Sequence, residues 1–412
     1  MSSSMRAVKA VQVPYEPTSD VLSLLETFRS MVNCCIRVGL EKNVTSRFSL
    51  QSETYHKLGN YGLHTWYSLS AIEAATAILK NYRKAKRRRQ NARVPRATKL
   101  IAKLGNQGYK VADGKLRIPI KPREYFYVPL HKRAAQFLSD ATLKLGSITL
   151  TSCAVSVVFS KIAEVAELGS YVAYDTNERS IDGAYVREDG GLAVESRDLS
   201  GVSEARQGYF ERVRRMQARY AKDRRVATKI QRRWFANQNS KVSTMLHQVS
   251  SAIVRQAKTR GQGIILEDLR HIRRTINRKV LGVNDFNRKI QMISIRSKRL
   301  KRRLNSWSFR RLQGFIEYKA LWDGAKITKV SAWDTSRVCA VCGCVMRDPK
   351  AKTVECCGMD RHVNACLSML KAQDERVRFT LDRSARVAVI SPFNKAMSQS
   401  GEVNPNGYQS QR

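Results

Sequence analysis

Three acidic residues stand where the sequence pattern predicts the end of a strand or the start of a helix. Asp175 and Glu267 each end an apolar, strand-like run, and Asp360 precedes a helical pattern. Cleavage of a phosphodiester with two Mg²⁺ ions about 3.5–4 Å apart requires carboxylates that converge from separate elements. Magnesium prefers oxygen ligands and keeps bound waters, one of which becomes the nucleophile. Each acid alone is weak evidence, because an Asp at a strand end usually caps a turn, but the three together predict a magnesium-dependent nuclease.

A cysteine cluster comes directly before Asp360. Five of the nine cysteines fall between Cys339 and Cys357, opening with a Cys-x-x-Cys-Gly knuckle and returning with an adjacent pair. Such clustering is typical of a metal site in a reducing compartment rather than of a disulfide framework. The pattern therefore predicts a metal-binding ribbon beside the third acid.

The excess of positive charge points to the class of partner. Lys and Arg number 75 against 34 Asp and Glu, which gives a formal net charge of +41. Nucleic acid is the natural partner of such a chain, because its phosphates release counterions when Lys and Arg approach. A ribosomal or chromatin protein would share this charge, but such proteins are usually shorter and less rich in apolar residues.

Two basic regions are candidates for phosphate contact. One ends a predicted helix over 68–84, and the other covers the first half of a long helical stretch from Gly208 to about Arg260. A solvated helix surface explains such runs about as well as a nucleic-acid contact does. Aromatic residues interleaved in the second region are more often core than base-stacking platforms. The candidate residues are Lys84, Lys86, Arg87, Arg88, Arg89, Arg212, Arg215, Arg219, Arg225 and Arg232.

The elements that position these residues change character along the chain. Met5–Val13 alternates in polarity and predicts a strand, and from Ser19 onward apolar residues recur at helical spacing. Short strands punctuated by Gly and Pro follow over 100–162, which is typical of a small β-barrel closed by the first strand. Tyr171–Asp175 and Ile181–Val186 then predict a hairpin.

Nothing in the sequence points to a membrane. No apolar run approaches the ~20 residues that span a bilayer, and no basic-then-apolar signal pattern opens the chain. We therefore expect a soluble protein without a membrane partner, located in the prokaryotic cytoplasm at the nucleoid.

The acidic motifs and the cysteine cluster together resemble the TnpB family, insertion-sequence-encoded RNA-guided nucleases ancestral to the compact type V CRISPR effectors. Tyr174-Asp175 is similar to the first RuvC motif and Leu266–Leu269 to the second. Asp360–Ala365 resembles the third motif, which is usually Asp-Arg-Asp-x-Asn-Ala-Ala. The segments 306–320 and 335–343 are similar to the family's approach to its zinc ribbon.

The resemblance implies an α+β multidomain fold. From about 165 to 370 the resemblance rests on specific motifs. Over the first 165 residues it concerns only the order of the predicted elements. The implied parts are a β-barrel wedge domain (1–18 and 100–165), a helical recognition insert (19–99), an RNase H-like RuvC nuclease domain (166–338), a zinc ribbon (339–358), the last RuvC motif with its helix (359–380) and a disordered tail (381–412).

The activity implied by the resemblance is cleavage of double-stranded DNA, directed by a structured guide RNA from the transposon's own end. The protein, expected as a monomer with its RNA, would read a short motif beside the target. Base pairing would read the rest, while the basic surface holds the heteroduplex by shape and phosphates. The implied cofactors are two Mg²⁺ ions, bound by the three acids as catalytic residues, and a structural Zn²⁺.

Two departures from the family motifs affect the site. Val354 stands where the family places the first cysteine of its second knuckle, and adjacent cysteines rarely both ligate one tetrahedral ion. A metal-free ribbon is therefore an alternative. The predicted zinc ligands are Cys339, Cys342, Cys356 and Cys357, with Cys344 as an alternative fourth.

The second departure concerns His362, which replaces the second acid of the third motif. We expect Asp360 to serve as the third acid and His362 to act as an auxiliary nitrogen ligand or a bystander. If Asp360 does not suffice, the protein would be a guided DNA-binding repressor without cleavage. A compact type V CRISPR effector is a further alternative, whereas the order of the acids disfavours a DDE-type transposase.

Overall fold

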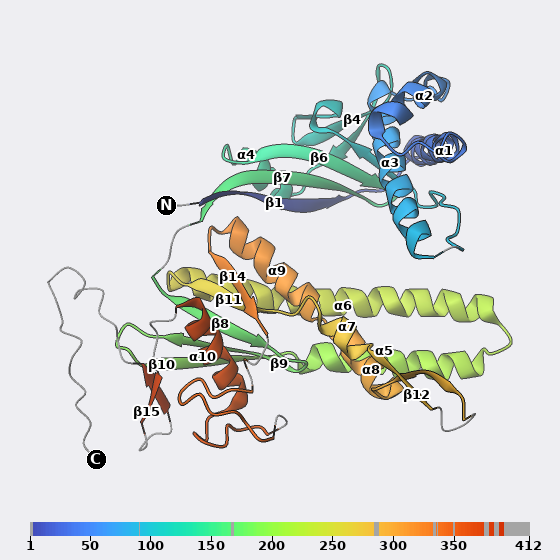
Figure 1. Cartoon of the computed structure of the whole chain (residues 1–412). Coiled ribbons are helices and arrows are strands. Elements are labelled where there is room, and N and C mark those ends of the chain that lie inside the picture. The colour runs from blue at the N-terminus through green and yellow to red at the C-terminus, as the bar shows by residue number, and fades with distance from the viewer. Residues whose placement is uncertain are drawn as a thin grey trace, which may run out of the picture. The chain divides into compact units, whose positions relative to one another are not determined.

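The computed structural model describes residues 3–89, 91–165, 169–283, 288–332, 335, 337–348, 351–374, 379–382 and 387–390. The chain divides into two compact units (Figure 1). One is Arg6–Ile162, and the other combines Met1–Met5 with Ala163–Arg412. In the described part of the chain, no helix is long and apolar enough to cross a membrane.

The three longest helices of the Arg6–Ile162 unit are α1 (Ser19–Glu41), α2 (Arg47–Gly59) and α3 (Thr65–Arg88). Thr18 and Ser46 cap the first two, because each side chain accepts a hydrogen bond from a first-turn N–H. The helical spacing that predicted α1 is confirmed, since every apolar residue on the predicted face is buried. These residues are Val21, Leu24, Leu25, Phe28, Met31, Val32 and Ile36.

The strands around these helices form two sheets where the sequence predicted a small barrel. The four-stranded sheet has the order β1-β7-β6-β2, and the three-stranded sheet has the order β3-β4-β5. The helices α1–α3 lie between β1 and β2 along the chain, as the expected insertion requires. The bounds are β1 (Ser3–Pro14), β2 (Ile101–Leu104), β3 (Lys110–Ala112), β4 (Lys115–Lys121), β5 (Glu124–Pro129), α4 (Lys132–Ser139), β6 (Lys144–Thr151) and β7 (Ala154–Val165).

The other unit is built on a five-stranded mixed sheet with the order β10-β9-β8-β11-β14. Strands β8, β11 and β14 are parallel, while β8, β9 and β10 form an antiparallel meander. The predicted hairpin is confirmed as β8 and β9, but β10 was not predicted, because none of the residues of this edge strand is buried and its last four residues are all polar. The bounds are β8 (Tyr171–Thr176), β9 (Ser180–Val186), β10 (Leu192–Asp198), β11 (Gly263–Asp268) and β14 (Ile327–Ser331).

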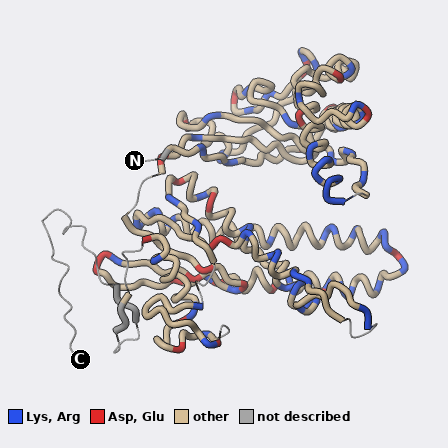
Figure 2. Tube along the Cα trace, in the orientation of Figure 1, with Lys and Arg blue, Asp and Glu red and all other residues tan. Residues whose placement is uncertain are grey.

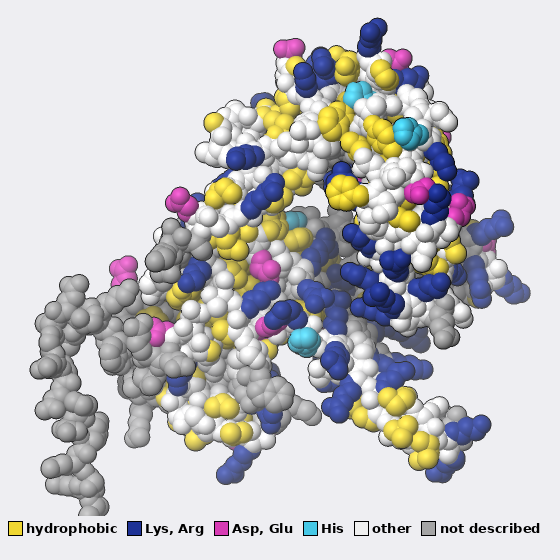
Figure 3. All heavy atoms as spheres, turned by 45° about the horizontal axis from the view of Figure 1, so that its top comes forward, with side chains coloured by type: hydrophobic (Ala, Val, Ile, Leu, Met, Phe, Trp, Pro, Cys, Tyr) yellow, Lys and Arg dark blue, Asp and Glu magenta, His cyan; other side chains and the backbone are white. Residues whose placement is uncertain are grey.

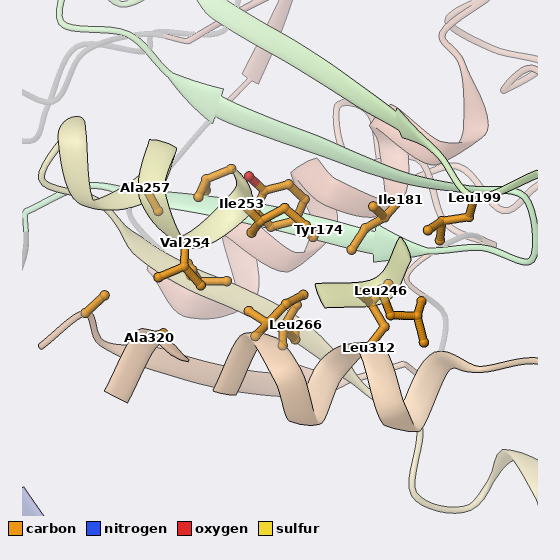
Figure 4. Close-up of a cluster of buried hydrophobic side chains, with 14 of the residues drawn as sticks. Tyr174, Ile181, Leu199, Leu246, Ile253, Val254, Ala257, Leu266, Leu312 and Ala320 are labelled. Carbon is orange, nitrogen blue, oxygen red and sulfur yellow. The ribbon is translucent and has the colours of Figure 1, made fainter. Parts of the chain in front are cut away.

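Helices cover both faces of this sheet. Tyr174 and Leu266 point to one face and pack against α6 (Arg224–Thr259) and α9 (Phe309–Trp322), as Figure 4 shows. Ala173 and Ile265 point to the other face and pack against α10 (Arg361–Gln373). Successive residues of a strand face opposite sides, so Asp175 and Glu267 lie on the α10 face. This mixed sheet between helices confirms the expected RNase H-like arrangement.

Two parts of this unit correct the expectations. The single helical stretch from Gly208 to Arg260 is two helices, α5 (Ser200–Arg219) and α6, because Asp223 caps a new helix through the N–H groups of Arg225 and Val226. Strand β15 (Phe379–Asp382) pairs with β16 (Val387–Ile390). The end of β15 and all of β16 fall in the segment expected to be disordered from 381 onward, so disorder is wrong for these residues. Residues 391–412 lie outside the described part.

The connection from β11 to β14 carries much of the basic sequence. It contains α7 (Ile272–Ile276), the unpredicted hairpin of β12 (Lys279–Val283) and β13 (Ile290–Ser294), and then α8 (Lys298–Ser306). Lys and Arg recur closely along α8 in the trace (Figure 2). In the space-filling view, they far outnumber Asp and Glu on the visible face (Figure 3).

We predict that Gly183→Ala destabilises the nuclease-like unit. Gly183 pairs with Tyr174 across β8 and β9, and a Cβ there would lie 2.5 Å from the buried tyrosine ring. The ring is held because its hydroxyl donates to Glu195, so overpacking should cost about 1–3 kcal/mol. Calorimetry of the full chain should show a lower unfolding midpoint.

Gly314→Ala in α9 is the matched control. A Cβ at this position meets nothing within 4 Å, and alanine in a helix gains about 0.5–1 kcal/mol over glycine. An equal effect of the two substitutions would contradict the close packing of Tyr174 on Gly183.

Candidate functional site

Asp175 and Glu267 lie side by side at the ends of neighbouring strands. Leu266 pairs with Tyr174 in the parallel register of β11 and β8, so the next residue of each strand lies on the opposite, α10 face. Asp175 is 8% exposed and Glu267 is 7% exposed. The structure therefore brings together two of the three acids that the sequence analysis selected.

The two carboxyl groups cannot both be ionised at low cost. Burial, followed by the neighbouring Asp175 charge, raises the pKa of Glu267 from 4.5 to about 8, although the Thr335 hydroxyl opposes this shift by donating to Oε1 over 3.0 Å. The raised pKa favours the protonated form of Glu267 beside the Asp175 charge. Carboxylate oxygens are the ligands that Mg²⁺ prefers, so this buried pair fits a divalent cation.

Asp360 has a different environment. It is the N-cap of α10, and its Oδ1 accepts hydrogen bonds from the backbone N–H groups of His362 (2.7 Å) and Val363 (3.2 Å). Its side chain is exposed, and in the described part of the chain it makes no hydrogen bond to Asp175 or Glu267. Oδ1 is thus engaged in capping, which leaves Oδ2 as the oxygen that could reach a metal.

His362, rather than Asp360, contacts the strand acids. Its Nδ1 lies 2.7 Å from Asp175 Oδ2, and this hydrogen bond is the main reason that the pKa of His362 is raised. Burial opposes the shift. A protonated imidazole here would place a positive charge directly on a carboxylate that a metal ion would use.

Two residues that the sequence analysis did not select complete the arrangement. Asn177 Nδ2 lies 2.9 Å from Asp175 Oδ2 and 3.1 Å from Asp182 Oδ2, so its two N–H groups can bridge both carboxylates. Asp182 pairs with Asp175 in the register of β9 and β8. Trp307 fixes the turn by donating to the Asn177 carbonyl over 2.8 Å. The hairpin that carries Asp182 could be predicted from the sequence, but the register that places Asp182 opposite Asp175 could not.

The four predicted zinc ligands converge. The sulfur atoms of Cys339, Cys342, Cys356 and Cys357 all lie within 4.8 Å of one another. Within the described residues, no other set of three or more His, Cys, Asp or Glu side chains is this close, so the strand acids do not form a comparably compact set with their neighbours. The cysteine cluster fits a structural zinc site, and Cys344 is not part of it.

The backbone explains how adjacent cysteines can both take part. The N–H of Gly343 donates to the Cys339 carbonyl (3.0 Å), and the N–H of Gly358 donates to the Val354 carbonyl (2.7 Å). Both glycines have positive φ, 77° and 63°, which closes each knuckle. The two knuckles are therefore equivalent turns in which Val354 takes the place of Cys339. The fourth thiol comes from Cys356 instead.

The cysteine cluster and α10 are joined by Asn364. This fully buried side chain accepts a hydrogen bond from the Ala340 N–H (2.8 Å) and donates to the Val338 carbonyl (2.9 Å). Lys371 Nζ donates to the Ala340 carbonyl over 2.7 Å. The knuckle is thereby tied to the helix that carries His362. The sequence analysis gave Asn364 no role of its own.

All ten basic candidates are exposed. Five of them end α3 in the Arg6–Ile162 unit, and the other five lie on α5 and α6. Lys and Arg at the end of α3 also interact favourably with the helix dipole, which is a structural reason for part of that run.

Sequence comparisons match two parts of the chain to known families. Residues 309–369 match the Cas12f1-like TNB domain, and residues 24–119 match the Uncharacterized protein MJ0013 family. The TnpB-like protein MJ0751 of Methanocaldococcus jannaschii is 24% identical over 65% of this chain and 94% of its own length. The TnpB-like protein MJ1635 of the same organism is 23% identical over 76% of this chain and 69% of its own length.

A solved structure shares the fold. A chain in the cryo-EM structure of the Cas12f1–sgRNA–target DNA complex superimposes with a TM-score of 0.57. The match covers 85% of this chain and 82% of the other, at 12% identity. The likeness at this identity concerns the fold.

We predict that Asp360→Ala and Asp360→Asn separate capping from metal binding. Alanine removes the cap and should cost about 0.5–2 kcal/mol of stability, whereas asparagine is an equally good N-cap and should preserve it. Thermal unfolding of both variants tests this. Equal stability of the two would contradict the capping role. Loss of cleavage in Asp360→Asn, in which the cap is preserved, would identify Asp360 as a metal ligand.

We predict one zinc ion per chain, measured by elemental analysis of the purified protein. Cys356→Ser should lower the zinc content, because it removes a thiol of the four-sulfur cluster. Cys344→Ser is the control and should leave the content unchanged. Full zinc in Cys356→Ser together with loss in Cys344→Ser would show that the fourth ligand is Cys344.

Proposed function

The chain belongs to the TnpB family, a lineage of RNA-guided nucleases, and we propose that it cuts double-stranded DNA beside a short motif under the direction of a guide RNA. The observation that carries this proposal is the pair of buried carboxyl groups, Asp175 and Glu267, at the ends of adjacent parallel strands. Burying two carboxylates side by side is costly because their negative charges repel, and a bound divalent cation would offset that repulsion.

In this proposal, Asp175 and Glu267 would hold Mg²⁺, with Asp360 contributing through Oδ2 as the third carboxylate. The ions, when bound, would polarise the phosphate and supply a nucleophilic water. The chain's own residues orient the carboxylates. The Thr335 hydroxyl fixes Glu267 Oε1, and the Asn177 amide fixes Asp175 Oδ2.

The proposed partners follow from charge and family. A guide RNA from the transposon end and a double-stranded DNA target would together supply the phosphates that a net charge of +41 requires. We propose one copy of the chain per guide RNA, acting at the nucleoid of a prokaryotic cell. Base pairing would provide the sequence specificity.

A second candidate function is guided DNA binding without cleavage. The contact of His362 Nδ1 with Asp175 Oδ2 favours it, because the hydrogen bond occupies an oxygen that would ligate the metal. The raised pKa of His362 adds to this competition, since its positive charge takes the place of part of the cation's charge. The protein would then act as a repressor at the same guided target.

We predict that Asp175→Ala and Glu267→Ala each abolish cleavage while guide RNA binding persists. The test is depletion of a plasmid library by protein co-expressed with the DNA that flanks its gene, with co-purified RNA sequenced in parallel. Cleavage at the wild-type rate in either variant would exclude the RuvC-type site.

His362→Asp distinguishes the two functions. It restores an oxygen ligand and removes the competing hydrogen bond, so we predict cleavage at least ~10-fold faster than wild type. Cleavage by the wild type supports the nuclease. Bound RNA without cleavage by the wild type, followed by gain of cleavage in His362→Asp, establishes the guided binding protein instead.

We predict that Mg²⁺ stabilises the protein more as pH rises. Because the pKa of Glu267 is raised to about 8 in the metal-free fold, its contribution to stability is full below about pH 4.5 and is lost as pH rises through about 8. Mg²⁺ requires the deprotonated pair. The increase in thermal midpoint on adding Mg²⁺ should therefore be larger at about pH 9 than at about pH 6.

His362→Gln is the control for this measurement, because it keeps both carboxylates. His362 loses its charge in the same direction of pH, so a pH dependence that is lost in His362→Gln would belong to His362. An equal Mg²⁺ effect at both pH values in the wild type would contradict the raised pKa of Glu267.

A further inference from the structure

A groove of about 910 Å³ runs along α5 and α6 and is bordered by Arg302 of α8. Its volume lies in the roughly 300–1,000 Å³ range of ligand pockets. The groove lies apart from the carboxylates and the cysteine cluster, because none of those residues lines it. The question is which ligand its side chains would recognise.

One polar side chain in the groove lacks a partner. Gln238 of α6 is 6% exposed, and its Nε2 is buried without a hydrogen bond in the described structure. Leaving a buried donor unsatisfied costs roughly 1–3 kcal/mol, so such groups call for an explanation. An acceptor on a bound ligand, such as the carbonyl oxygen of a base, would satisfy the amide.

The side chains that line the groove carry positive charge, although α5 also contains two acidic residues, Glu204 and Glu211, that do not line it. Arg206, Arg214, Arg232 and Arg302 line it, and none of its lining residues within the described chain is acidic. Helix α6 contains no Asp or Glu in its 36 residues. The ligand is therefore expected to be an anion.

Arg206 is the most constrained of these arginines. Its Nε donates to Ser308 Oγ over 2.8 Å, and burial together with the nearby charges of Arg311 and Arg273 lowers its pKa. It also lines the small cavity next to Thr176, the residue after Asp175. Arg206 thus borders both the groove and this separate small cavity.

An aromatic ring supplies a surface for stacking. Phe235 of α6 lines the groove and is 53% exposed, although large apolar side chains are normally buried. Its ring centroid lies 6.0 Å from that of the buried Tyr209, and the two rings pack edge to face. Aromatic rings beside arginines are the usual means of holding unpaired bases.

We propose that this groove binds single-stranded nucleic acid. The arginines would hold the phosphates, Phe235 would stack on a base, and Gln238 Nε2 would donate to a base carbonyl oxygen. The inference rests on the proposed function for the class of ligand and deepens it by assigning a subsite on the α5–α6 pair. DNA and RNA strands share this chemistry, and the test separates them.

The test measures equilibrium binding by the full chain after co-purified RNA has been removed. EDTA is present, so that no probe is cleaved during the measurement. The fluorescent probes are a thymine DNA strand, an abasic strand of equal length, a uracil RNA strand and the thymine–adenine duplex. The variants are Gln238→Met, Phe235→Ala and Arg232→Gln, and the matched control is Arg233→Gln, an exposed neighbour outside the groove.

We expect Gln238→Met to weaken binding of the thymine strand ~5-fold and Phe235→Ala to weaken it ~10-fold, with little effect on the abasic strand. Arg232→Gln should weaken binding of both strands, and Arg233→Gln neither. Gln238→Met should not lower the thermal midpoint, because the amide makes no hydrogen bond in the free protein. A purely structural role for Gln238 would lower it.

Tighter binding of the thymine strand than of the uracil strand would identify DNA as the occupant, and the reverse would identify RNA. Three results would overturn the proposal. They are wild-type affinity in both Gln238→Met and Phe235→Ala, an equal loss in Arg233→Gln and Arg232→Gln, and duplex binding as tight as that of the single strands. Each of these outcomes leaves the nuclease proposal intact.

Discussion

The parallel pairing of β8 with β11 is the constraint on which the candidate site depends. It places Asp175 and Glu267 side by side on a buried face, where water cannot screen their charges. The fold compensates with directed donors, the Thr335 hydroxyl on one carboxyl and the Asn177 amide on the other. Even so, the pKa of Glu267 stays far above its ordinary value. This cost is the physical basis for proposing that the pair binds a cation.

Helix α10 connects the chemistry to the cysteine cluster. One end of it presents His362 to Asp175, while Asn364, one half-turn further, holds the first knuckle by its backbone. Apolar residues of the same helix, among them Leu367 and Leu370, pack on the sheet. Because α10 contacts both the ribbon and Asp175, disorder in the ribbon would also change the position of His362 relative to Asp175.

The distribution of charge follows from what each helix must do. Helix α6 buries Val242, Leu246 and Ile253 against the sheet, and this apolar stripe fixes its position. Its other half extends beyond the sheet, beside α5, and carries Arg residues, while α6 itself contains no Asp or Glu. Self-repulsion in such a helix lowers stability unless a polyanion is bound. The proposed nucleic-acid partner would relieve this repulsion.

The sequence by itself determined the elements whose signals are local. Periodic apolar residues predicted α1, strand-like runs ending in acids predicted β8 and β11, and the cysteine spacing predicted the ribbon, all of which the structure contains. A periodic pattern records which face of a segment is buried, so it can be read without knowing the partner. Weakly patterned elements were missed for the same reason. The edge strand β10 and the exposed hairpin of β12 and β13 bury little, so their apolar residues leave no clear period.

Only the tertiary structure decided which side chains meet. The sequence ranked Asp360 above His362, but the start of α10 directs His362 towards Asp175 and uses Asp360 Oδ1 as a cap. It could not select Asp182 or Asn177, because strand register and turn geometry bring them to Asp175. Likewise, the equivalence of the two knuckles, with Val354 in the place of Cys339, appears only in the backbone hydrogen bonds. Contacts of this kind join residues far apart in the chain, and no local pattern in the sequence encodes them.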